Sequence, residues 1–517
     1  MQSSIDQQGA PGMPTVKSTS DPLIKPPGMR PPRLSKSRYV NGLQCPLRLW
    51  LQSYARQEAT PTDESLQAIF DTGNHVGRVA TGRHPGGILV DEDHKHHAEA
   101  EHRTLRLLND RSVPALFEAA FSHRKVAIRA DILARSGRGR WDLVEVKSST
   151  QVKDPNLDDL AVQLWVLSQQ GVNIGNAGIL TLNTSYVYQG GEYDLHELFT
   201  LHDLAREARA KGREVEKNVG RLLRMLAADE APDIEPGDHC STPYECPFQA
   251  FCTRGYAVVE DPIDELPRLS QRARAQLEAE GVQTIHELPD DFRLTEVQAR
   301  VRDAVVSGRP YVGEGLQEAL AEVTWPLYHL DFETFAPALP RYPGTSPYQA
   351  IPFEWSCHVE QRDGSTEHRL FLAFEDEDPR EAFCRTLIDA VGSKGSVCVY
   401  SGYERGQLSR LARDLPHHAQ AIKRIDDRLW DLLKVVREHY YHPDFHGSFS
   451  IKSVLPALVP SLGYDDLGIQ DGQAAGRAHL EAITTDDEAR KRELQQHLID
   501  YCTRDTRAMV EVRRALL

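Results

Sequence analysis

Residues 328–334 read Tyr-His-Leu-Asp-Phe-Glu-Thr, and this stretch indicates the fold of the C-terminal half of the chain. Apolar and polar residues alternate in it, which predicts a β-strand because successive side chains of a strand point to opposite faces. Leu330 and Phe332 then face a core. The carboxylates of Asp331 and Glu333 share the other face, where such a pair can begin a site for two divalent metal ions ~3.5–4 Å apart.

Further polar residues downstream could complete this site. Tyr501 and Asp505 are four positions apart in a stretch with helical periodicity, so both lie on one helix face. Glu404 follows an expected strand and turn, and Asp431 lies in a second segment nearby. The family resemblance that these residues carry implies that Asp505 and one of these two acidic residues join the carboxylates of the strand.

The order Asp-x-Glu-Thr followed by Tyr-x-x-x-Asp resembles the DEDD exonucleases of the RNase H-like fold, in their tyrosine variant. The resemblance implies a DnaQ-like 3′–5′ exonuclease domain with Mg²⁺ or Mn²⁺ at the carboxylates. It also implies that the hydroxyl of Tyr501 positions the attacking water. The family usually has an aspartate in its middle motif, so Glu404 departs from the pattern and Asp431 stays an alternative.

Two strands in the N-terminal half carry a second set of polar residues. Residues 125–134 and 141–148 read as strands separated by the turn-forming Ser-Gly-Arg-Gly-Arg. Glu145 and Lys147 share one strand face, and Asp131 belongs to the neighbouring strand. Two carboxylates can hold a hard divalent cation, and a lysine beside them can orient water or stabilise a charged transition state.

This arrangement resembles the PD-(D/E)xK nuclease core, and two further residues make it similar to the RecB-like branch. His75 resembles the additional histidine metal ligand of that branch, and Gln163 resembles its glutamine motif after the core. The resemblance therefore implies metal ligands at His75, Asp131 and Glu145, with Lys147 and Gln163 as catalytic residues. A lone Glu-x-Lys is common on solvated strands, but the ordered set is much more specific.

Three of the eight cysteines lie close together in the sequence. Cys240, Cys246 and Cys252 are each separated by five residues, whereas zinc knuckles and ribbons use pairs with two to four residues between them. Three thiolates with one distant partner suit an iron–sulfur cluster better, and Cys45 is the expected fourth ligand. The remaining cysteines are expected to be buried small apolar residues: Cys357, Cys384, Cys398 and Cys502.

One cysteine before the nuclease core and three after it is similar to the iron–sulfur nucleases of the RecB-like group. These include CRISPR adaptation nucleases and AddB-type helicase–nuclease subunits. The resemblance implies a 4Fe–4S cluster on Cys45, Cys240, Cys246 and Cys252 that ties the ends of the domain together. We expect its role to be structural, because closing so long a loop restricts the unfolded chain strongly. Zinc is the alternative.

The composition sets wider limits. The 517 residues are too many for one hydrophobic core, and their hydrophobic and charged content is ordinary for a soluble protein. The net charge of −16 does not decide against a nucleic-acid partner, because phosphates respond to local fields. No window approaches the ~20 uncharged apolar residues of a membrane span, so no membrane partner is expected. Residues 1–33 lack an apolar signal core and predict a disordered tail, which favours a cytoplasmic location.

We expect an α/β multidomain chain with four regions. They are a disordered tail (1–33), a RecB-like PD-(D/E)xK domain with the four-cysteine cluster (34–256), a helical linker (257–322) and an RNase H-like mixed-sheet domain (323–517). Helices are expected at 64–80, 94–110, 156–170, 197–228, 379–392, 404–414, 427–440 and 487–515. Further strands are expected at 176–189, 326–332, 352–360, 368–374 and 396–400.

In the linker, two helices are expected to flank a turn at Glu280-Gly281-Val282. This resembles a helix–hairpin–helix, in which backbone amides at the turn meet phosphate. A plain helical spacer is an equal alternative.

Segments 348–356 and 447–456 are similar to an uncharacterised bacterial family that joins these two domains, so the resemblance covers roughly residues 34–517. It implies a metal-dependent nuclease acting on single-stranded or end-containing DNA, in DNA repair or phage defence. A helicase or a defence-system protein is the expected partner. Two alternatives stay open: an exonuclease that trims RNA, and a nucleic-acid-binding scaffold with one decayed site.

Overall fold

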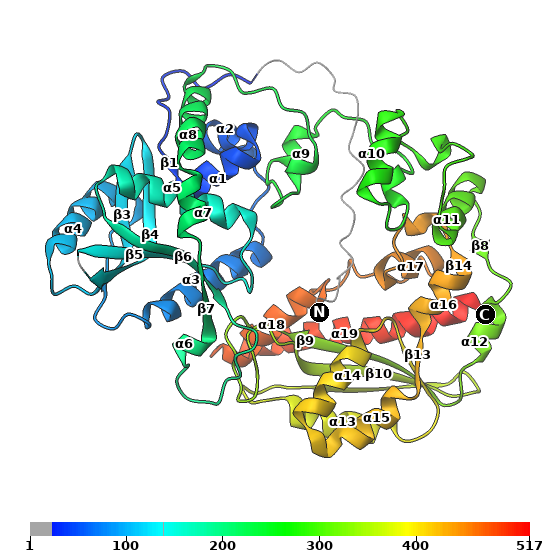
Figure 1. Cartoon of the computed structure of the whole chain (residues 1–517). Helices are drawn as coiled ribbons and strands as arrows, with labels where there is room; N and C mark the ends of the chain where they lie inside the picture. Colours follow the sequence, from blue (N-terminus) through cyan, green and yellow to red (C-terminus); the bar gives the residue numbers. More distant parts are fainter. Residues whose placement is uncertain (1–22, 138) are drawn as a thin grey trace. The chain divides into compact units, whose positions relative to one another are not determined.

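The computed structural model describes residues 23–137 and 139–517, which divide into two compact units (Figure 1). The first unit contains residues 23–257 and 338–348, and the second contains residues 258–337 and 349–517. Each unit combines helices with a mixed β-sheet, so the chain is a multidomain α/β protein.

The first unit is built on a mixed sheet with the strand order β2-β3-β4-β5-β6-β7, and β1 pairs with β4. The strands are β1 (Leu34–Ser35), β2 (Ile88–Leu89), β3 (Ala115–His123), β4 (Val126–Gly137), β5 (Arg140–Val146), β6 (Ile174–Leu182) and β7 (Phe199–Asp203). Strand β4 is antiparallel to β3 and β5. Strands β5 and β6 are parallel, because a crossover helix connects them.

Helices cover both faces of this sheet. They are α1 (Lys36–Gln44), α2 (Pro46–Tyr54), α3 (Glu64–Thr81), α4 (His97–Asn109), α5 (Asp154–Gln169), α6 (Leu195–Leu198), α7 (Ala205–Ala210), α8 (Gly212–Ala227) and α9 (Gln249–Cys252). On one face, Leu143 of β5 packs in a core with residues of α2, α5 and α8. On the other face, Val76 of α3 packs with Val144. Glu145, which alternates with Val144, therefore points to the side of α5.

A segment distant in the sequence completes the core of the first unit. Residues 338–348 form part of the connection between β9 and β10, yet Ala338 and Leu339 are buried in the same cluster as Val144. Backbone hydrogen bonds join Tyr188 N to Thr345 O (2.9 Å) and Gly344 N to Tyr188 O (2.7 Å). The first unit is thus not continuous in sequence.

The second unit contains a five-stranded sheet with the order β11-β10-β9-β12-β13. The strands are β9 (Leu327–Phe335), β10 (Ile351–Glu360), β11 (Thr366–Leu372), β12 (Ser396–Val399) and β13 (Leu429–Asp431), and a separate pair joins β8 (Tyr311–Val312) to β14 (Tyr440–Tyr441). Strands β9 to β11 form an antiparallel meander, and β12 is parallel to both β9 and β13.

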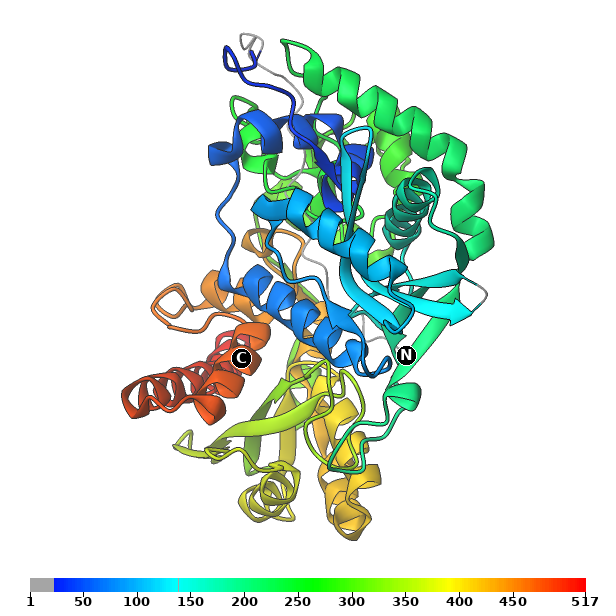
Figure 2. The same ribbon diagram turned by 90° about the vertical axis from the view of Figure 1, so that its left-hand side faces the viewer.

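Helices lie on opposite sides of this sheet (Figures 1 and 2). The helices of the second unit are α10 (Gln271–Ala279), α11 (Glu296–Ser307), α12 (Leu316–Ala321), α13 (Arg380–Val391), α14 (Tyr403–Asp414), α15 (Ala419–Asp426), α16 (Leu432–His439), α17 (Ile451–Leu458), α18 (Gly472–Thr484) and α19 (Glu488–Leu516). Phe332 and Trp355 pack against α13–α15. The alternate residues of β9 and β10 therefore face α18 and α19.

Three expected elements differ in the structure. Residues 197–228 do not form one helix, because 199–203 pair with β6 as β7. Residues 427–440 begin with β13, whose pairing with β12 extends the sheet before α16 starts. The strand expected at 176–189 ends at Leu182, where the chain enters a loop held by the residues around Thr345. In each case tertiary pairing overrides the local pattern. Strand β3 was not among the expected strands.

The linker also differs in detail. Helix α10 precedes the turn, and Gly281 adopts a left-handed conformation (φ +77°) that ends it. The segment after the turn is only a three-residue 3₁₀ turn, Ile285–Glu287, so the second of the two expected helices is wrong. Helix α11 follows this turn.

Most of the predicted tail, residues 1–22, lies outside the described residues. In its remaining part, Ile24 forms a β-bridge with Glu230, and Lys25 N donates to Asp229 O (2.7 Å). Within the described ranges, none of the helices has the length and apolar character needed to cross a bilayer.

Candidate functional site

Four carboxylates of the second unit converge on the sheet face below α19. Asp331 and Glu333 project from β9, Asp505 from α19 and Glu404 from the first turn of α14. We call these four residues the second cluster. Burial raises the pKa of Asp331 well above its ordinary value, and the nearby charges of Asp505, Glu333 and Glu404 raise it further. One donor atom each of Asp331, Glu333 and Cys502 lies within 4.8 Å of the others.

Among the described residues, the second cluster has no cation in direct contact with its carboxylates; burial raises the pKa of Glu333, and the charge of Lys452 opposes this shift only from a distance. No Lys or Arg forms an ion pair with any of its four carboxylates in the described part of the chain. Burial raises the pKa of Glu404 to about 7 and that of Asp505 to about 6. Buried carboxylates that repel one another in this way either take up protons or bind a cation.

Tyrosine and lysine side chains line one side of the second cluster. Tyr464 donates a hydrogen bond of 2.5 Å from its hydroxyl to Asp505 Oδ1. Lys452 Nζ lies 3.2 Å from the hydroxyl of Tyr501, which is 4 % exposed. Lys452 is therefore the nearest cation to the cluster, and it contacts the cluster through Tyr501.

Glu404 and Asp431, the two alternatives for the middle ligand, lie in different places. The side chain of Glu404 forms a hydrogen bond with Asp331, and its Oε2 atom is buried without a hydrogen-bond partner. Asp431 ends β13 and caps α16, accepting a hydrogen bond of 3.1 Å from Lys434 N. The geometry thus brings Glu404 into the cluster, while the carboxylate of Asp431 already satisfies a helix end.

A fifth acidic residue, Glu354, was not among the expected site residues. It lies on β10 opposite Glu333, and it is fully buried with no hydrogen-bond partner for either carboxylate oxygen. Burial raises its pKa to about 8, with a further contribution from Asp505. In the sequence Glu354 lies between the aromatic residues Phe353 and Trp355, a pattern that does not show what the glutamate faces.

The first unit brings together Asp131 from β4, Glu145 from β5 and two residues of α5, Asp159 and Gln163. We call the three carboxylates the first cluster. Lys147 Nζ lies 2.7 Å from both Glu145 Oε1 and Asp159 Oδ2. Gln163 Nε2 donates to Glu145 Oε2 (2.8 Å) and to Asp159 Oδ1 (3.2 Å).

Lys36, at the start of α1, occupies the space between two of these carboxylates. Its Nζ atom lies 3.0 Å from Asp131 Oδ1, 2.8 Å from Glu145 Oε1 and 2.9 Å from Glu145 Oε2. Neither Lys36 nor Asp159 was an expected site residue. The spacing of Asp159 four residues before Gln163 on one helix could have indicated it, but nothing local pairs Lys36 with residues about a hundred positions away.

Charge compensation shapes the first cluster. Burial alone would raise the pKa of Glu145, but Lys147 and Lys36 outweigh it and lower that pKa. Burial, followed by the charge of Glu145, raises the pKa of Asp131 to about 7. The cluster therefore holds an ionised glutamate between two ammonium groups.

His75 is not brought to these residues. It lies on α3, whose buried side chains Val76 and Ala80 face the sheet, and its own ring is exposed. No hydrogen bond or ion pair joins it to Asp131 or Glu145 among the described residues. Its role as a metal ligand stays a prediction.

The four cysteines expected to bind a cluster line one cavity. Cys45 caps α2, and the residues around it in the cavity include Arg48 and Phe248. Burial raises the pKa of Cys45, and the proximity of Cys240 adds to this shift. For Cys246, burial raises the pKa while backbone hydrogen bonding and Arg48 oppose the shift. The remaining members of the group are Cys240 and Cys252.

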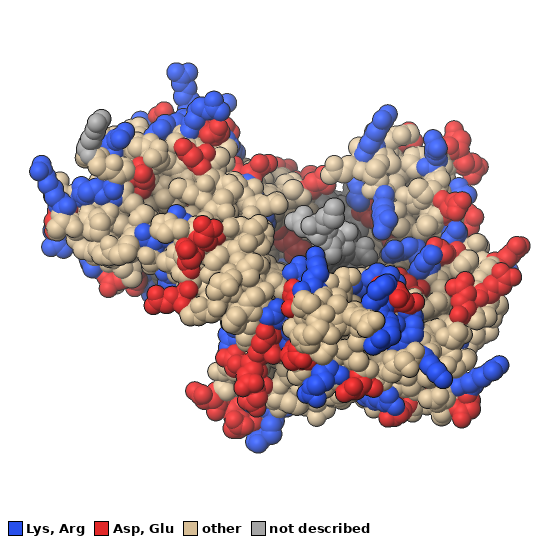
Figure 3. All heavy atoms as spheres, turned by 60° about the horizontal axis from the view of Figure 1, so that its bottom comes forward, with Lys and Arg blue, Asp and Glu red and all other residues tan. Residues whose placement is uncertain are grey.

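The surface charge is mixed in character. Lys and Arg side chains are interspersed with Asp and Glu side chains on the face of each unit drawn in Figure 3. The net charge of −16 is therefore not gathered into one continuous acidic field on this face. An acidic total charge does not by itself exclude a polyanionic ligand here.

Comparison with known proteins gives one match. The model of a family described as a domain of unknown function (DUF2779) matches residues 328–450, which include Asp331, Glu333, Glu404 and Asp431. No curated protein matches the chain. The matched segment begins in β9 and ends before α17, so it covers three of the carboxylates that form the second cluster and leaves out Asp505.

Proposed function

We propose that the chain is a metal-dependent nuclease with two separate sites, one in each unit, that cleaves phosphodiester bonds of DNA. The observation that carries the proposal is the convergence of Asp331, Glu333, Glu404 and Asp505 from three separate elements without a basic partner in the described chain. Buried oxygen donors of this kind fit Mg²⁺ or Mn²⁺, which prefer carboxylate ligands.

The topology of the second unit supports an RNase H-like exonuclease. An antiparallel meander, β9 to β11, is followed by two strands that are parallel to β9, in the order β11-β10-β9-β12-β13. This is the arrangement expected of the RNase H-like fold. Tyr501 lies on the same helix as Asp505, as the tyrosine variant of the DEDD exonucleases requires.

The topology of the first unit supports a PD-(D/E)xK core. Strands β3, β4 and β5 form an antiparallel meander, α5 crosses over, and β6 runs parallel to β5. Asp131, Glu145 and Lys147 lie where the PD-(D/E)xK resemblance expects a metal site, and Gln163 contacts Glu145. His75 would have to approach from α3 to serve as the additional ligand.

The metals would act as Lewis acids and lower the pKa of bound water. The protein side chains do the remaining work. In the second unit, the hydroxyl of Tyr501 orients the attacking water, and Lys452 holds that hydroxyl in place at 3.2 Å. In the first unit, Lys147 is fixed by Glu145 and Asp159, so that its ammonium group can stabilise the developing charge on phosphate.

The four cysteines would hold a 4Fe–4S cluster with a structural role. A donor set of four thiols in one cavity fits such a group. Three groups of donor atoms within 4.8 Å of one another occur among the described residues, and none contains two of these cysteines. No three of these sulfur atoms therefore lie within 4.8 Å of one another, as the ~4 Å edges of a tetrahedral zinc site with ~2.3 Å bonds would require. Zinc remains the alternative.

Anaerobic purification tests this cofactor. We expect visible absorbance together with about four iron and four sulfide per chain. Replacement of Cys246 by serine should remove both, while Cys384→Ser, a change at a buried cysteine outside the cavity, should leave them. A colourless protein with one zinc ion per chain would establish the alternative.

Separate inactivation of the two sites tests the nuclease proposal. Asp131→Ala and Asp331→Ala are each expected to lower one activity by at least about 100-fold and to spare the other. The measurement uses end-labelled linear and closed circular substrates with Mg²⁺ or Mn²⁺, made of DNA and of RNA in parallel. Degradation by the double variant at the rate of the unchanged chain would refute the proposal. If RNA is cleaved faster than DNA, then RNA is the substrate in place of DNA.

The cellular setting belongs to the same proposal. A nuclease with two sites suits DNA repair or phage defence in the cytoplasm, with a helicase or defence-system protein as a partner. If neither cluster binds metal, a nucleic-acid-binding scaffold is favoured over a nuclease. Calorimetric titration of the unchanged chain and of Glu333→Gln with Mg²⁺ or Mn²⁺ distinguishes these two functions.

A further inference from the structure

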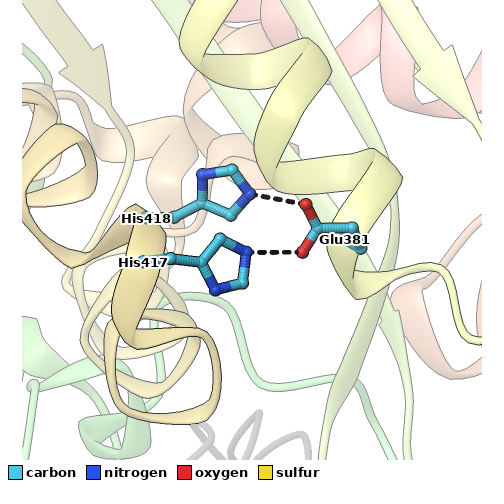
Figure 4. A group of neighbouring side chains, drawn as sticks. All are labelled: Glu381, His417 and His418. Atoms are coloured by element: carbon cyan, nitrogen blue, oxygen red, sulfur yellow. Dashed lines mark hydrogen bonds and ion pairs between the residues drawn. The ribbon is translucent and has the colours of Figure 1, made fainter.

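Among the described residues, two groups of three closely spaced histidine and carboxylate donors lie outside the clusters described above, both in the second unit. In one, Glu381 of α13 accepts hydrogen bonds from His417 (2.9 Å) and His418 (2.8 Å), one at each carboxylate oxygen (Figure 4). The side chains of Glu381 and His417 are 55 % and 60 % exposed. Every carboxylate oxygen is satisfied in this group, and an ordinary surface ion pair explains it.

The other group joins the linker to the loop after β14. One donor atom each of Asp261, Glu265 and His446 lies within 4.8 Å of the others. His446 Nδ1 lies 3.1 Å from Glu265 Oε1, and His286 Nε2 lies 2.9 Å from Asp261 Oδ2. Two carboxylates and one imidazole therefore meet within the second unit, and His286 contacts this group through Asp261.

Unlike the exposed group, this one contains an unsatisfied ligand atom. The side chain of Glu265 is only 13 % exposed, and its Oε2 atom is buried without a hydrogen-bond partner. Burial raises the pKa of Glu265, and the nearby charge of Asp261 raises it further, although His446 opposes the shift. Neither carboxylate has a Lys or Arg partner among the described residues.

The backbone holds the group in place. Gly447 has φ +75°, and a Cβ atom there would collide with the backbone of Glu265, so only glycine allows the loop to approach so closely. Gly447 N also donates to the hydroxyl of Tyr441 (2.9 Å). Close by in the sequence, Arg300 of α11 donates to the carbonyl oxygen of Arg437 (3.2 Å). The linker therefore contacts the 437–447 region at two places, Arg300 with Arg437 and Glu265 with Gly447.

We propose that Asp261, Glu265 and His446 form a structural site for a divalent transition metal, with Zn²⁺ as the favoured ion, and that His286 orients Asp261 through its hydrogen bond. Imidazole nitrogen and carboxylate oxygen are a donor set that suits Zn²⁺, whereas the all-carboxylate clusters suit Mg²⁺ or Mn²⁺. The bound ion satisfies the unpartnered oxygen of Glu265 and joins the linker to the loop after β14. This site is independent of the proposed nuclease activity.

Zinc stoichiometry of the full chain tests the proposal. The chain is stripped with chelator, dialysed against Zn²⁺ and analysed for bound metal. We expect Glu265→Gln to bind one zinc ion fewer per chain than the unchanged protein. Glu381→Gln, in the exposed group of Figure 4, is the matched control and should bind as many as the unchanged chain. Zinc bound at any other site contributes equally to each variant, so it cancels when the zinc contents per chain are subtracted.

A second variant guards against misfolding. His446 is 68 % exposed and has φ +47°, a conformation that asparagine tolerates, so His446→Asn should fold and also lose one zinc ion. Hydrogen exchange at residues 261–266 should slow on addition of Zn²⁺ in the unchanged chain and not in either variant. Equal zinc content in Glu265→Gln, His446→Asn and the unchanged chain would overturn the proposal, as would loss of an ion only in Glu381→Gln.

Discussion

The two acidic clusters both bury several carboxylates close together, but they differ in how the negative charge is balanced. In the first, Lys36 and Lys147 lie within 3.0 Å of the carboxylates, so cations are part of the fold. In the second, four carboxylates are buried together, and the nearest lysine, Lys452, bonds only to Tyr501 and to a backbone carbonyl. The difference teaches that carboxylate pairs with similar sequence patterns can differ in how their charge is balanced. The second cluster must take up protons or a cation from outside, whereas the first is balanced by lysines of the chain itself.

Matched glutamine substitutions should affect the two clusters with opposite signs. Ionised Glu145 has a lowered pKa and so stabilises the folded state, and Glu145→Gln should cost about 3 kcal/mol in the metal-free protein. Glu333 has a raised pKa, so its ionised form opposes folding, and Glu333→Gln should add about 1 kcal/mol. Urea unfolding with chelator at pH 8, followed by hydrogen exchange in β5 and β9, measures both. If the free energy of unfolding changes in the same direction in both variants, the predicted difference between the two clusters is wrong.

Divalent metal should stabilise the second unit more than the first. An ion that binds only the folded state at 100 times its Kd adds about 2.7 kcal/mol, and the second cluster offers four ligands without a competing cation. Thermal unfolding with and without Mn²⁺, read by hydrogen exchange in β9 and in β5, gives the two values. Equal protection of both strands contradicts this prediction.

Removal of Lys36 should make the first cluster more like the second. Its ammonium group stands between Asp131 and Glu145, where a divalent ion would bind, and the two cations exclude each other. We expect Lys36→Met to tighten Mn²⁺ binding at this cluster about tenfold, which is ~1.4 kcal/mol. Titration calorimetry in a Glu333→Gln background isolates the first cluster. Lys452→Met is the control and should leave this affinity unchanged.

Glu354 should show the smallest effect. Burial keeps its pKa at about 8, so the group is mostly protonated at neutral pH and adds little charge to the second cluster. Glutamine resembles the protonated acid in shape, and Glu354→Gln should change kcat by no more than about twofold. A large loss of kcat with unchanged folding would show that Glu354 works in its ionised form.

The spacing of residues in the sequence was enough to predict which side chains share one face of a strand or a helix. Glu145 and Lys147 on one strand, and Tyr501 and Asp505 on one helix, follow from the periods of the two structures. The convergence of strand β9 and helix α19 was expected only through the family resemblance. The roles of these residues stay predictions, and the structure supplies their proximity.

Residues that act across long sequence distances were missed. Lys36 meets Asp131 across 95 positions, and no period or spacing connects them. Strands β7 and β13 were mistaken for helix because charged residues favour helix locally, while pairing with β6 and β12 decides the outcome. Glu354 was overlooked because a lone glutamate in an apolar strand gives no indication of what it faces.

The return of residues 338–348 to the core of the first unit has a consequence for biosynthesis. A ribosome releases the chain from its N-terminus, and Ala338 and Leu339 emerge more than eighty residues after Ala257. The first unit therefore cannot complete its core until translation has entered the second. A gene truncated after codon 257 would yield a domain with an open apolar surface beside Tyr186, which is a target for chaperones and proteases.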